Sequence, residues 1–213
     1  MPTITQITEQ KRRANRRSVY LDGKFAFGCN INVVAKFRLR EGLVISEADV
    51  ARIRDGEVRQ ECFDHAIKFI EKRLHSRKEL SDKLKRQEYP IEMIDSVLDQ
   101  LTEMGYVNDA KFAEGKVSAA AKYKHQGPNR ARIELAKKGI DREVARQVVE
   151  EVYESHDSMS VARDLARKKM RSLARLEPVV AKRRLYGMLL RRGFDYDTIK
   201  PVVEEVLGGA DEE

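Results

Sequence analysis

The chain has 213 residues, of which 36% are charged and 7% aromatic, and its formal net charge is +7. It contains no run of about 18 apolar residues, which excludes a membrane-spanning helix, and its first residues lack the charged and apolar blocks of a secretion signal. Cys29 and Cys62 are far apart and form no CxxC motif, so we expect both to be reduced and buried in a cytoplasmic protein.

The charge is unevenly distributed along the chain. Residues 1–60 carry 12 basic and 7 acidic side chains, whereas residues 61–109 carry 8 and 11. Residues 110–157 carry 10 and 8, residues 158–213 carry 12 and 9, and Arg163–Arg192 alone holds 11 basic and 2 acidic residues. Basic ends around an acidic middle favour a partner that is nucleic acid or a nucleoprotein, although a solvated helical surface has the same pattern.

The first 30 residues predict a small β-sheet. Short runs of alternating apolar residues flank the dipeptide Asp22-Gly23. An Asp-Gly pair between β-forming segments favours a hairpin, because both central residues need a positive φ. We expect a two- or three-stranded antiparallel unit, which must dock on an apolar surface to be stable.

Two helices are predicted after this sheet. A short helix over Ile31–Arg40 ends at Gly42. Ser46 and Asp49 have the spacing of a capping box, which predicts the start of a further helix around residues 47–54.

From about Gly56 onward, a hydrophobic pattern of helical spacing occurs three times. The first copy comprises Leu80, Leu84, Tyr89, Ile94, Val97, Leu98 and Leu101. The third copy, 105 residues later, comprises Leu185, Leu189, Phe194, Ile199, Val202, Val203 and Val206. The middle copy, 51 residues after the first, includes Leu135, Ile140, Val148, Val149 and Val152. A period near 50 residues predicts stacked helical repeats, and such arrays usually present a long surface to a partner.

The sequence therefore predicts a mainly α-helical fold, in which three tandem three-helix repeats form a curved, elongated array behind a small N-terminal antiparallel β-hairpin module. The expected segments are the module at 1–58, the repeats at 59–109, 110–157 and 158–207, and a disordered acidic tail at 208–213. We interpret Tyr89, Tyr106 and Tyr123 as core residues of the repeats and not as platforms on which bases stack.

No catalytic or metal-binding motif is found in the sequence. The four histidines are far apart: His65, His75, His125 and His156. Neither of the two Gly-Lys pairs has the remaining residues of a phosphate-binding P-loop, and no GxSxG motif occurs. Many carboxylates lie four residues from Lys or Arg, where ion pairing explains them. We therefore predict a monomeric binding protein that is not an enzyme and uses no cofactor, metal ion or small-molecule substrate.

Three groups of basic residues are candidates for contacts with DNA or a nucleoprotein filament. The first group lies in or just before the hairpin and comprises Arg12, Arg13, Arg16 and Arg17. The second group ends the middle helix of each repeat and comprises Lys85, Arg86, Lys137, Lys138, Arg191 and Arg192. The third group lies on adjacent helices of the last repeat and comprises Arg167, Lys168, Lys169, Arg171, Lys182, Arg183 and Arg184.

Each group also has a structural explanation. Charges in the hairpin protect the edge of a sheet from pairing with another chain. Cations at the end of a helix neutralise its dipole, although their recurrence in three repeats would form a basic track. The density of cations in the last repeat exceeds what solubility requires, which favours a functional surface there.

Short motifs in the repeats are similar to those of one known family. The motifs are Leu74–Leu80, Gly105–Asp109 with Phe112 and Ala113, Gly127-Pro128 with Arg130, Glu134–Ile140, and Arg191–Phe194 with Ile199. Together, over residues 62–207, they resemble the RecX family of bacterial recombination regulators, and the N-terminal strands resemble an extension found in part of that family. Glu88 departs from the family where a glycine usually ends the helix, and Ala131 stands where a larger apolar residue is usual.

The resemblance implies a regulator of the recombinase RecA. Members of the family bind RecA and its filament on single-stranded DNA, and suppress its ATPase, strand-exchange and co-protease activities by lying in the filament groove or blocking filament growth. Two alternatives stay open from the residues alone. One is a general DNA-binding protein that competes for single strands, and the other is a scaffold unrelated to nucleic acid.

Overall fold

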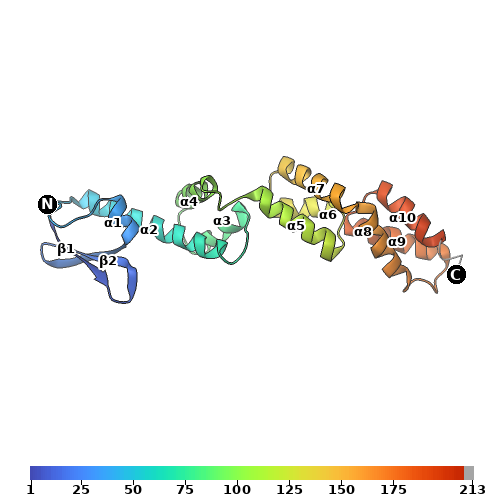
Figure 1. Ribbon diagram of the computed structural model, residues 1–213, viewed down its shortest axis with the longest axis horizontal. Coiled ribbons are helices and arrows are strands. Elements are labelled where there is room, and N and C mark those ends of the chain that lie inside the picture. Colours follow the sequence, from blue (N-terminus) through green and yellow to red (C-terminus); the bar gives the residue numbers. More distant parts are fainter. Residues whose placement is uncertain (209–213) are drawn as a thin grey trace. The chain divides into compact units, whose positions relative to one another are not determined.

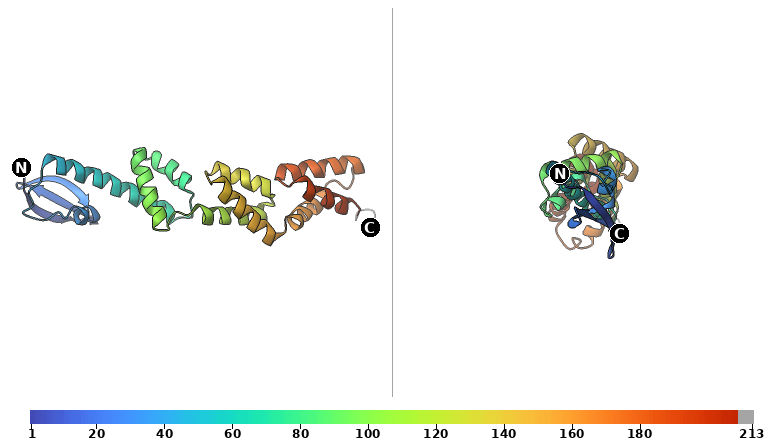
Figure 2. Two further views of the ribbon diagram at one scale, coloured as in Figure 1. Left: turned by 90° about the horizontal axis from the view of Figure 1, so that it is seen from above. Right: turned by 90° about the vertical axis from the view of Figure 1, so that its left-hand side faces the viewer.

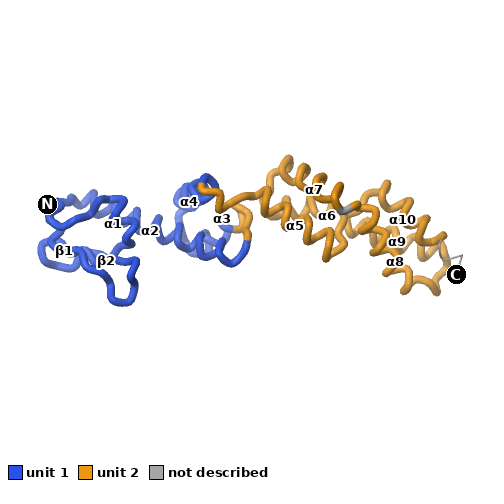
Figure 3. The backbone as a smooth tube through the Cα atoms, viewed as in Figure 1, with its two compact units in different colours: residues 1–73, 80–103 blue, residues 74–79, 104–213 orange. Residues whose placement is uncertain are grey.

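The computed structural model describes residues 1–208, so the predicted acidic tail lies outside the described residues apart from Gly208. The described residues form three strands and ten helices (Figure 1). They are divided between two compact units (Figure 3). The first unit comprises Met1–Arg73 and Leu80–Glu103, and the second comprises Leu74–Glu79 and Met104–Glu213.

The N-terminal module is a three-stranded antiparallel sheet. Strands β1 (Ile4–Gln10), β2 (Arg13–Leu21) and β3 (Lys24–Asn30) pair in the order β1-β2-β3. Asp22 and Gly23, between β2 and β3, have φ values of +48° and +78°, which confirms the predicted hairpin turn. The core of the module consists of Ile4, Val19, Cys29, Val33, Leu39, Ile45 and Ile53. Since these residues include two from helices, the sheet docks on an apolar surface as predicted.

Helix α1 (Ile31–Lys36) is shorter than predicted. Asn30 caps its start, because its side-chain oxygen accepts a hydrogen bond from the backbone N–H of Asn32 at 3.0 Å. The chain leaves the helix at Phe37, and Arg38 adopts a φ of +51°. The predicted helix to residue 40 is therefore wrong by one turn.

Helix α2 (Glu47–Ile70) is a single helix of 24 residues that joins the sheet to the first repeat (Figure 2). Its start confirms the predicted capping box between Ser46 and Asp49. The helix predicted around residues 47–54 continues to Ile70, beyond its predicted extent. Gly56 lies within α2, and a Cβ atom there would come within 2.6 Å of the Phe37 ring. The glycine thus permits close packing of an aromatic side chain and does not end the helix.

Three groups of three helices follow the module. The first group comprises α2, α3 (Arg77–Lys85) and α4 (Ile91–Glu103). The second comprises α5 (Asp109–Lys124), α6 (Pro128–Lys137) and α7 (Arg142–His156). The third comprises α8 (Ser158–Met170), α9 (Pro178–Arg192) and α10 (Tyr196–Gly208). Because α2 crosses from the module into the first repeat, a division into separate domains at the predicted boundaries stays a prediction.

The recurring hydrophobic pattern forms the cores of the three repeats. Every residue of the pattern is buried except Tyr89, and the second and third repeats have a core cluster each. This confirms the predicted helical-repeat fold, while the curvature of the whole array stays a prediction. The core assignment is wrong for Tyr106 and Tyr123, whose exposed fractions are 51% and 81%. Tyr123 lies off the buried stripe of α5, and Tyr106 lies in the link between α4 and α5.

In the second unit, the start of α3 contacts the turn that ends α6. The Ser76 hydroxyl donates a hydrogen bond to the carbonyl oxygen of Lys138 at 2.8 Å. The Lys138 ammonium group forms an ion pair with Glu79 at 2.7 Å. Gly139 follows with a φ of +74°, and a Cβ atom there would lie 2.7 Å from the side chain of Lys78. We call this contact the first junction.

The start of α6 contacts the turn that ends α9 in the same way. The backbone N–H of Gly127 donates to the carbonyl oxygen of Arg192 at 2.8 Å, and that of Asn129 donates to Gly193 at 3.0 Å. Gly193 has a φ of +93°, and a Cβ atom there would collide with the backbone of Arg130. This second junction uses residues 51 and 54 positions after their counterparts in the first, so equivalent contacts occur twice within the second unit.

The ends of the array differ from its junctions. In the first repeat, Glu88 takes the place of Gly139 and Gly193, with a φ of +62° and an exposed side chain. A non-glycine residue fits because no earlier repeat lies against it. In the third repeat, the backbone N–H of Ala181 already donates to Glu177 within α9, whereas the equivalent Gly127 donates across a junction. Helix α9 therefore begins about one turn earlier than α6 does.

Candidate functional site

The first group of candidate cations is divided by the structure. Since Arg13, Arg16 and Arg17 lie on β2, the central strand of the sheet, the alternative that their charges protect a sheet edge is wrong, whereas Arg12 lies in the turn between β1 and β2. Arg12 and Arg13 are exposed. Arg16 instead forms an ion pair with Glu57 of α2 at 2.7 Å and with Glu61 at 3.3 Å, and its side chain is only 18% exposed.

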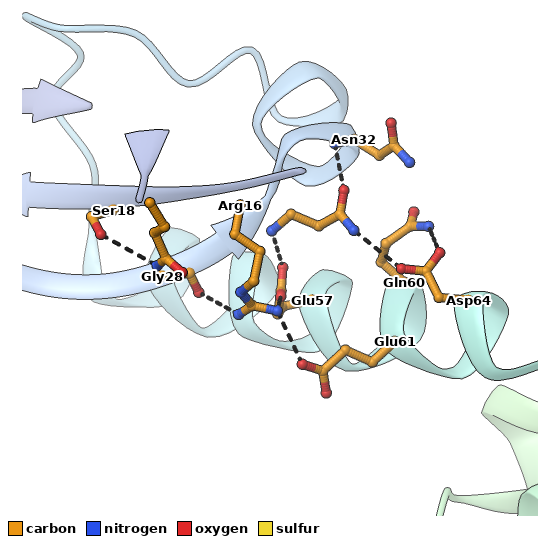
Figure 4. A network of polar contacts seen from close by, with 10 residues as sticks. Arg16, Ser18, Gly28, Asn32, Glu57, Gln60, Glu61 and Asp64 are labelled. Carbon is orange, nitrogen blue, oxygen red and sulfur yellow. Dashed lines mark hydrogen bonds and ion pairs between the residues drawn. The ribbon is translucent and has the colours of Figure 1, made fainter. Parts of the chain in front are cut away.

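A polar network holds the end of the sheet on α2 (Figure 4). The backbone N–H of Asn30 donates to Glu57 at 2.6 Å, and its side-chain amide donates to Asp64 at 3.2 Å. The guanidinium group of Arg17 donates to the carbonyl oxygen of Ala14 at 2.7 Å. Arg16 and Arg17 are thus engaged within the module, and we retain Arg12 and Arg13 as candidate contacts.

The second group shows a division that repeats along the chain. Lys138 and Arg192 serve the two junctions, and Arg192 also donates to the carbonyl oxygen of Lys124 at 2.6 Å. The preceding residues, Lys137 and Arg191, are exposed. Lys85 and Arg86 are exposed as well, but they belong to the first unit. A basic track along all three repeats therefore stays a prediction.

In the third group, Arg167 differs from the other six residues. It forms an ion pair with Glu205 of α10 at 3.0 Å, and Arg163 pairs with the same carboxylate at 2.9 Å. The other six are exposed and comprise Lys168, Lys169, Arg171, Lys182, Arg183 and Arg184. They lie on α8, on α9 and in the link between them, as the sequence predicted.

A groove of about 650 Å³ lies between the end of α8 and the outer face of α9. We call it the α8–α9 groove. Its lining residues are Lys169, Leu173, Arg183, Arg184, Gly187, Met188 and Arg191. In the described part of the chain, its four cationic side chains form no ion pair. The groove therefore combines strong positive charge with a small apolar floor.

The groove joins cations that the sequence placed in separate groups. Lys169, Arg183 and Arg184 come from the third group, and Arg191 comes from the second. Sequence reasoning missed Gly187 and the apolar floor. The signal that could have found the glycine is its spacing, since Gly187 lies four residues from an arginine on either side.

The two cysteine thiols of the chain do not line the α8–α9 groove. Cys29 and Cys62 are buried free thiols, and burial raises the pKa of each to about 11, so both stay protonated near neutral pH. No cluster of three or more His, Cys, Asp or Glu side chains suited to a metal ion occurs among the described residues. Within residues 1–208, no helix has both the length and the hydrophobicity that a membrane crossing requires.

The fold and the groove define a class of protein: a helical-repeat protein with a cationic surface on its last repeat. Four family models match the chain in order. They are the RecX N-terminal domain at residues 2–46 and the first, second and third RecX three-helix domains at 62–101, 108–149 and 157–203.

Individual relatives agree with these matches. The chain is 31% identical to the regulatory protein RecX of Bacillus pumilus over 217 residues, covering 100% of this chain and 81% of the relative. It is 31% identical to that of Bacillus subtilis over 206 residues, covering 97% of this chain and 78% of the relative. The chain belongs to the RecX family of regulatory proteins.

Two solved structures share the fold. A crystal structure of regulatory protein RecX has a TM-score of 0.88 at 22% identity, and the match covers 96% of this chain and 100% of the other. The structure of RecX from Lactobacillus salivarius has a TM-score of 0.67 at 24% identity, covering 71% and 97% of the two chains.

Proposed function

We propose that this protein is a non-catalytic regulator of the RecA recombinase. It binds the RecA filament on single-stranded DNA and suppresses the ATPase, strand-exchange and co-protease activities of that filament. The observation that carries the proposal is the match of the whole chain to a family of regulatory proteins, with all four domains in order. A regulator of RecA acts where RecA acts, which places the protein in the cytoplasm.

The repeat fold supports this function physically. A nucleoprotein filament offers phosphate charge from its DNA and both signs of charge from its protein. The third repeat carries unpaired cations around the α8–α9 groove, whereas residues 61–109 have more acidic than basic side chains. Contacts made at several points on one filament add up, because each later contact forms at a high effective concentration. Occupation of the filament then hinders the subunit movements that ATP hydrolysis requires.

A titration of the DNA-dependent ATPase of the cognate RecA tests this proposal. We expect inhibition at amounts of this protein well below those of RecA, since one bound regulator affects several subunits of a filament. An unchanged ATPase rate at equimolar amounts would contradict the proposal. Light scattering by preformed filaments in the same titration separates filament disassembly from inhibition on an intact filament.

The groove also favours a second candidate function. Four cations that form no ion pair within residues 1–208 suit DNA phosphates directly, which favours a general DNA-binding protein that competes for single strands. Excess free single-stranded DNA, added to RecA filaments formed beforehand, distinguishes the two functions. A competitor loses its effect under these conditions, whereas a filament-binding regulator retains most of it.

A further inference from the structure

Gly187 is unusual because it lies within α9 and no packing contact requires it. Glycine disfavours a helix interior relative to alanine. A Cβ atom at this position would come within 3.2 Å of the tip of the Arg191 side chain, with no other neighbour within 4 Å. The equivalent positions of the first two repeats are Asp82 and Ile133, so the repeat fold accepts a side chain there. Only the flexible tip of the Arg191 side chain lies over the glycine, and we call this gap in the side-chain surface of α9 the opening.

Cations lie on both sides of this opening. Arg183 and Arg191 are four residues before and after Gly187, which places all three on one face of α9. The two arginine Cα atoms are thus about 12 Å apart along the helix axis. Lys169 of α8 lines the same groove from the opposite side. A ligand in the groove therefore meets positive charge from two helices while it lies close to the backbone of α9.

We infer that the α8–α9 groove binds the phosphodiester backbone of single-stranded DNA, with Gly187 allowing that backbone to approach α9 between Arg183 and Arg191. This inference rests on the proposed function, because it names the component of the filament that the third repeat contacts. Arginine suits the role because its planar guanidinium group donates two parallel hydrogen bonds to a phosphate.

The floor of the groove favours a single strand over a duplex. Met188 is partly exposed there beside the glycine. An unstacked base or sugar contacts such an apolar surface, whereas the bases of a duplex are stacked inside it. An acidic peptide is the competing ligand class, since its carboxylates also pair with arginine. It would gain less from the opening at Gly187, because carboxylates on side chains reach the arginine tips without close approach of their backbone.

Binding of a fluorescently labelled oligothymidylate to the full-length protein, followed by anisotropy, tests the inference without RecA. Gly187→Glu places a carboxylate in the opening, and we expect binding to weaken about tenfold or more. Gly115→Glu in α5 is the matched control. Gly115 is an exposed glycine within a helix with no neighbour within 4 Å, and the residue four positions after it is Ala119, so no arginine tip lies over it. Equal binding by the Gly187→Glu variant and the unchanged protein would overturn the inference.

Both substitutions replace glycine by a better helix former, so circular dichroism should show intact helices in each variant. If the two variants lose binding equally, the effect is one of net charge and the groove assignment is wrong. Competition with polyglutamate tests whether the groove prefers an acidic peptide. Displacement of the oligonucleotide by polyglutamate at equal charge concentration would assign the groove to acidic protein instead.

Salt dependence gives an independent measure of the contacts. Four cations that neutralise four phosphates of a single strand predict a slope of about −2.8 for the logarithm of the binding constant against that of the salt concentration. Replacing Arg183 and Arg191 together by glutamine should reduce the slope to about −1.4. An unchanged slope in this double variant would show that the phosphates bind elsewhere.

The inference and the proposed function can fail separately. Oligonucleotide binding requires no recombinase, and the ATPase titration requires no knowledge of the groove. Groove-dependent DNA binding by a protein that leaves the ATPase unchanged would overturn the function alone. Inhibition of the ATPase, together with oligonucleotide binding that is unchanged in the Gly187→Glu variant, would overturn the inference alone.

Discussion

The second and third repeats have matching cores and different surfaces. Leu135 of α6 and Leu189 of α9 occupy one position of the repeat, and both are buried. The residues on the outer face differ in how their charges are paired. Arg130 of α6 forms an ion pair with Glu134, four residues later, at 3.1 Å. The equivalents in α9 are Arg184 and Met188, so the arginine is left without that carboxylate.

This difference shows where function lies in a repeat protein. The recurring residues fix the helices and their stacking, and they are apolar in every repeat although their size differs at some positions. The residues that break the recurrence, such as Gly187 in place of Ile133, give one repeat a surface that the others lack. Substitutions that give one repeat a residue of another therefore test whether that residue serves the shared fold or the surface of a single repeat.

The largest effect is expected at the second junction. Gly193→Val adds a side chain where a Cβ atom already collides with the backbone of Arg130, at a φ of +93°. We expect the free energy of unfolding to fall by about 3 kcal/mol or more, measured by urea denaturation. Gly115→Val, at an exposed helical glycine with open space around it, is the control and should change stability by less than about 1 kcal/mol. Similar losses in the free energy of unfolding for both variants would contradict the close packing of Gly193 against Arg130.

The next effect concerns the core of the third repeat. Leu185 is fully buried, and its equivalent in the second repeat is Ala131. Leu185→Ala gives the third repeat the residue of the second. Because the side chains around Leu185 pack against a leucine, we expect a cavity and a loss of about 3 kcal/mol in the free energy of unfolding. Urea denaturation measures it, and a loss below about 1 kcal/mol would mean that the site collapses around alanine.

The reverse change should stabilise the second repeat. A small, partly open pocket of about 60 Å³ lies beside Ala131, with Val117 and Leu135 in its lining as well as charged residues such as Lys124 and Glu134. Ala131→Val fills part of this space with two carbon atoms, and we expect a gain of about 1 kcal/mol in the free energy of unfolding. A loss of stability instead would show that the neighbouring helices cannot accommodate the larger side chain.

The smallest effect is expected at the first repeat. Glu88→Gly gives this repeat the glycine that the other two have at positions 139 and 193. Since Glu88 holds a φ of +62°, which costs a residue with a side chain, we expect a gain of up to about 1 kcal/mol. Thermal unfolding detects this gain as a higher midpoint temperature, and a lower midpoint would indicate a contact made by the Glu88 carboxylate.

Much of the fold could be predicted from the sequence because it depends on local signals. Helical spacing of apolar residues located the repeat cores, and the capping box of Ser46 and Asp49 marked the start of α2. The full length of α2 was not predicted, because Gly56 can be placed inside a helix only when the residue packed on it is known. Phe37, which explains that glycine, lies 19 positions away in the sequence.

The candidate site was predicted only in part. The density of cations in the last repeat was visible in the sequence. Which of them share a groove depends on how α8 lies against α9, and this brings Lys169 near Arg191. Pairing with Glu205 or Glu57 likewise engages Arg167 and Arg16, and neither carboxylate is near its partner in the sequence.

The most direct test of the account compares two charge reversals in the ATPase assay. Arg183→Glu with Arg191→Glu alters the α8–α9 groove, whereas Lys111→Glu with Lys122→Glu makes the same change of charge on exposed residues of α5. We predict that the first variant loses most of its inhibition of RecA and that the second inhibits like the unchanged protein. Equal inhibition by the two variants would contradict the assignment of the regulatory surface to the third repeat.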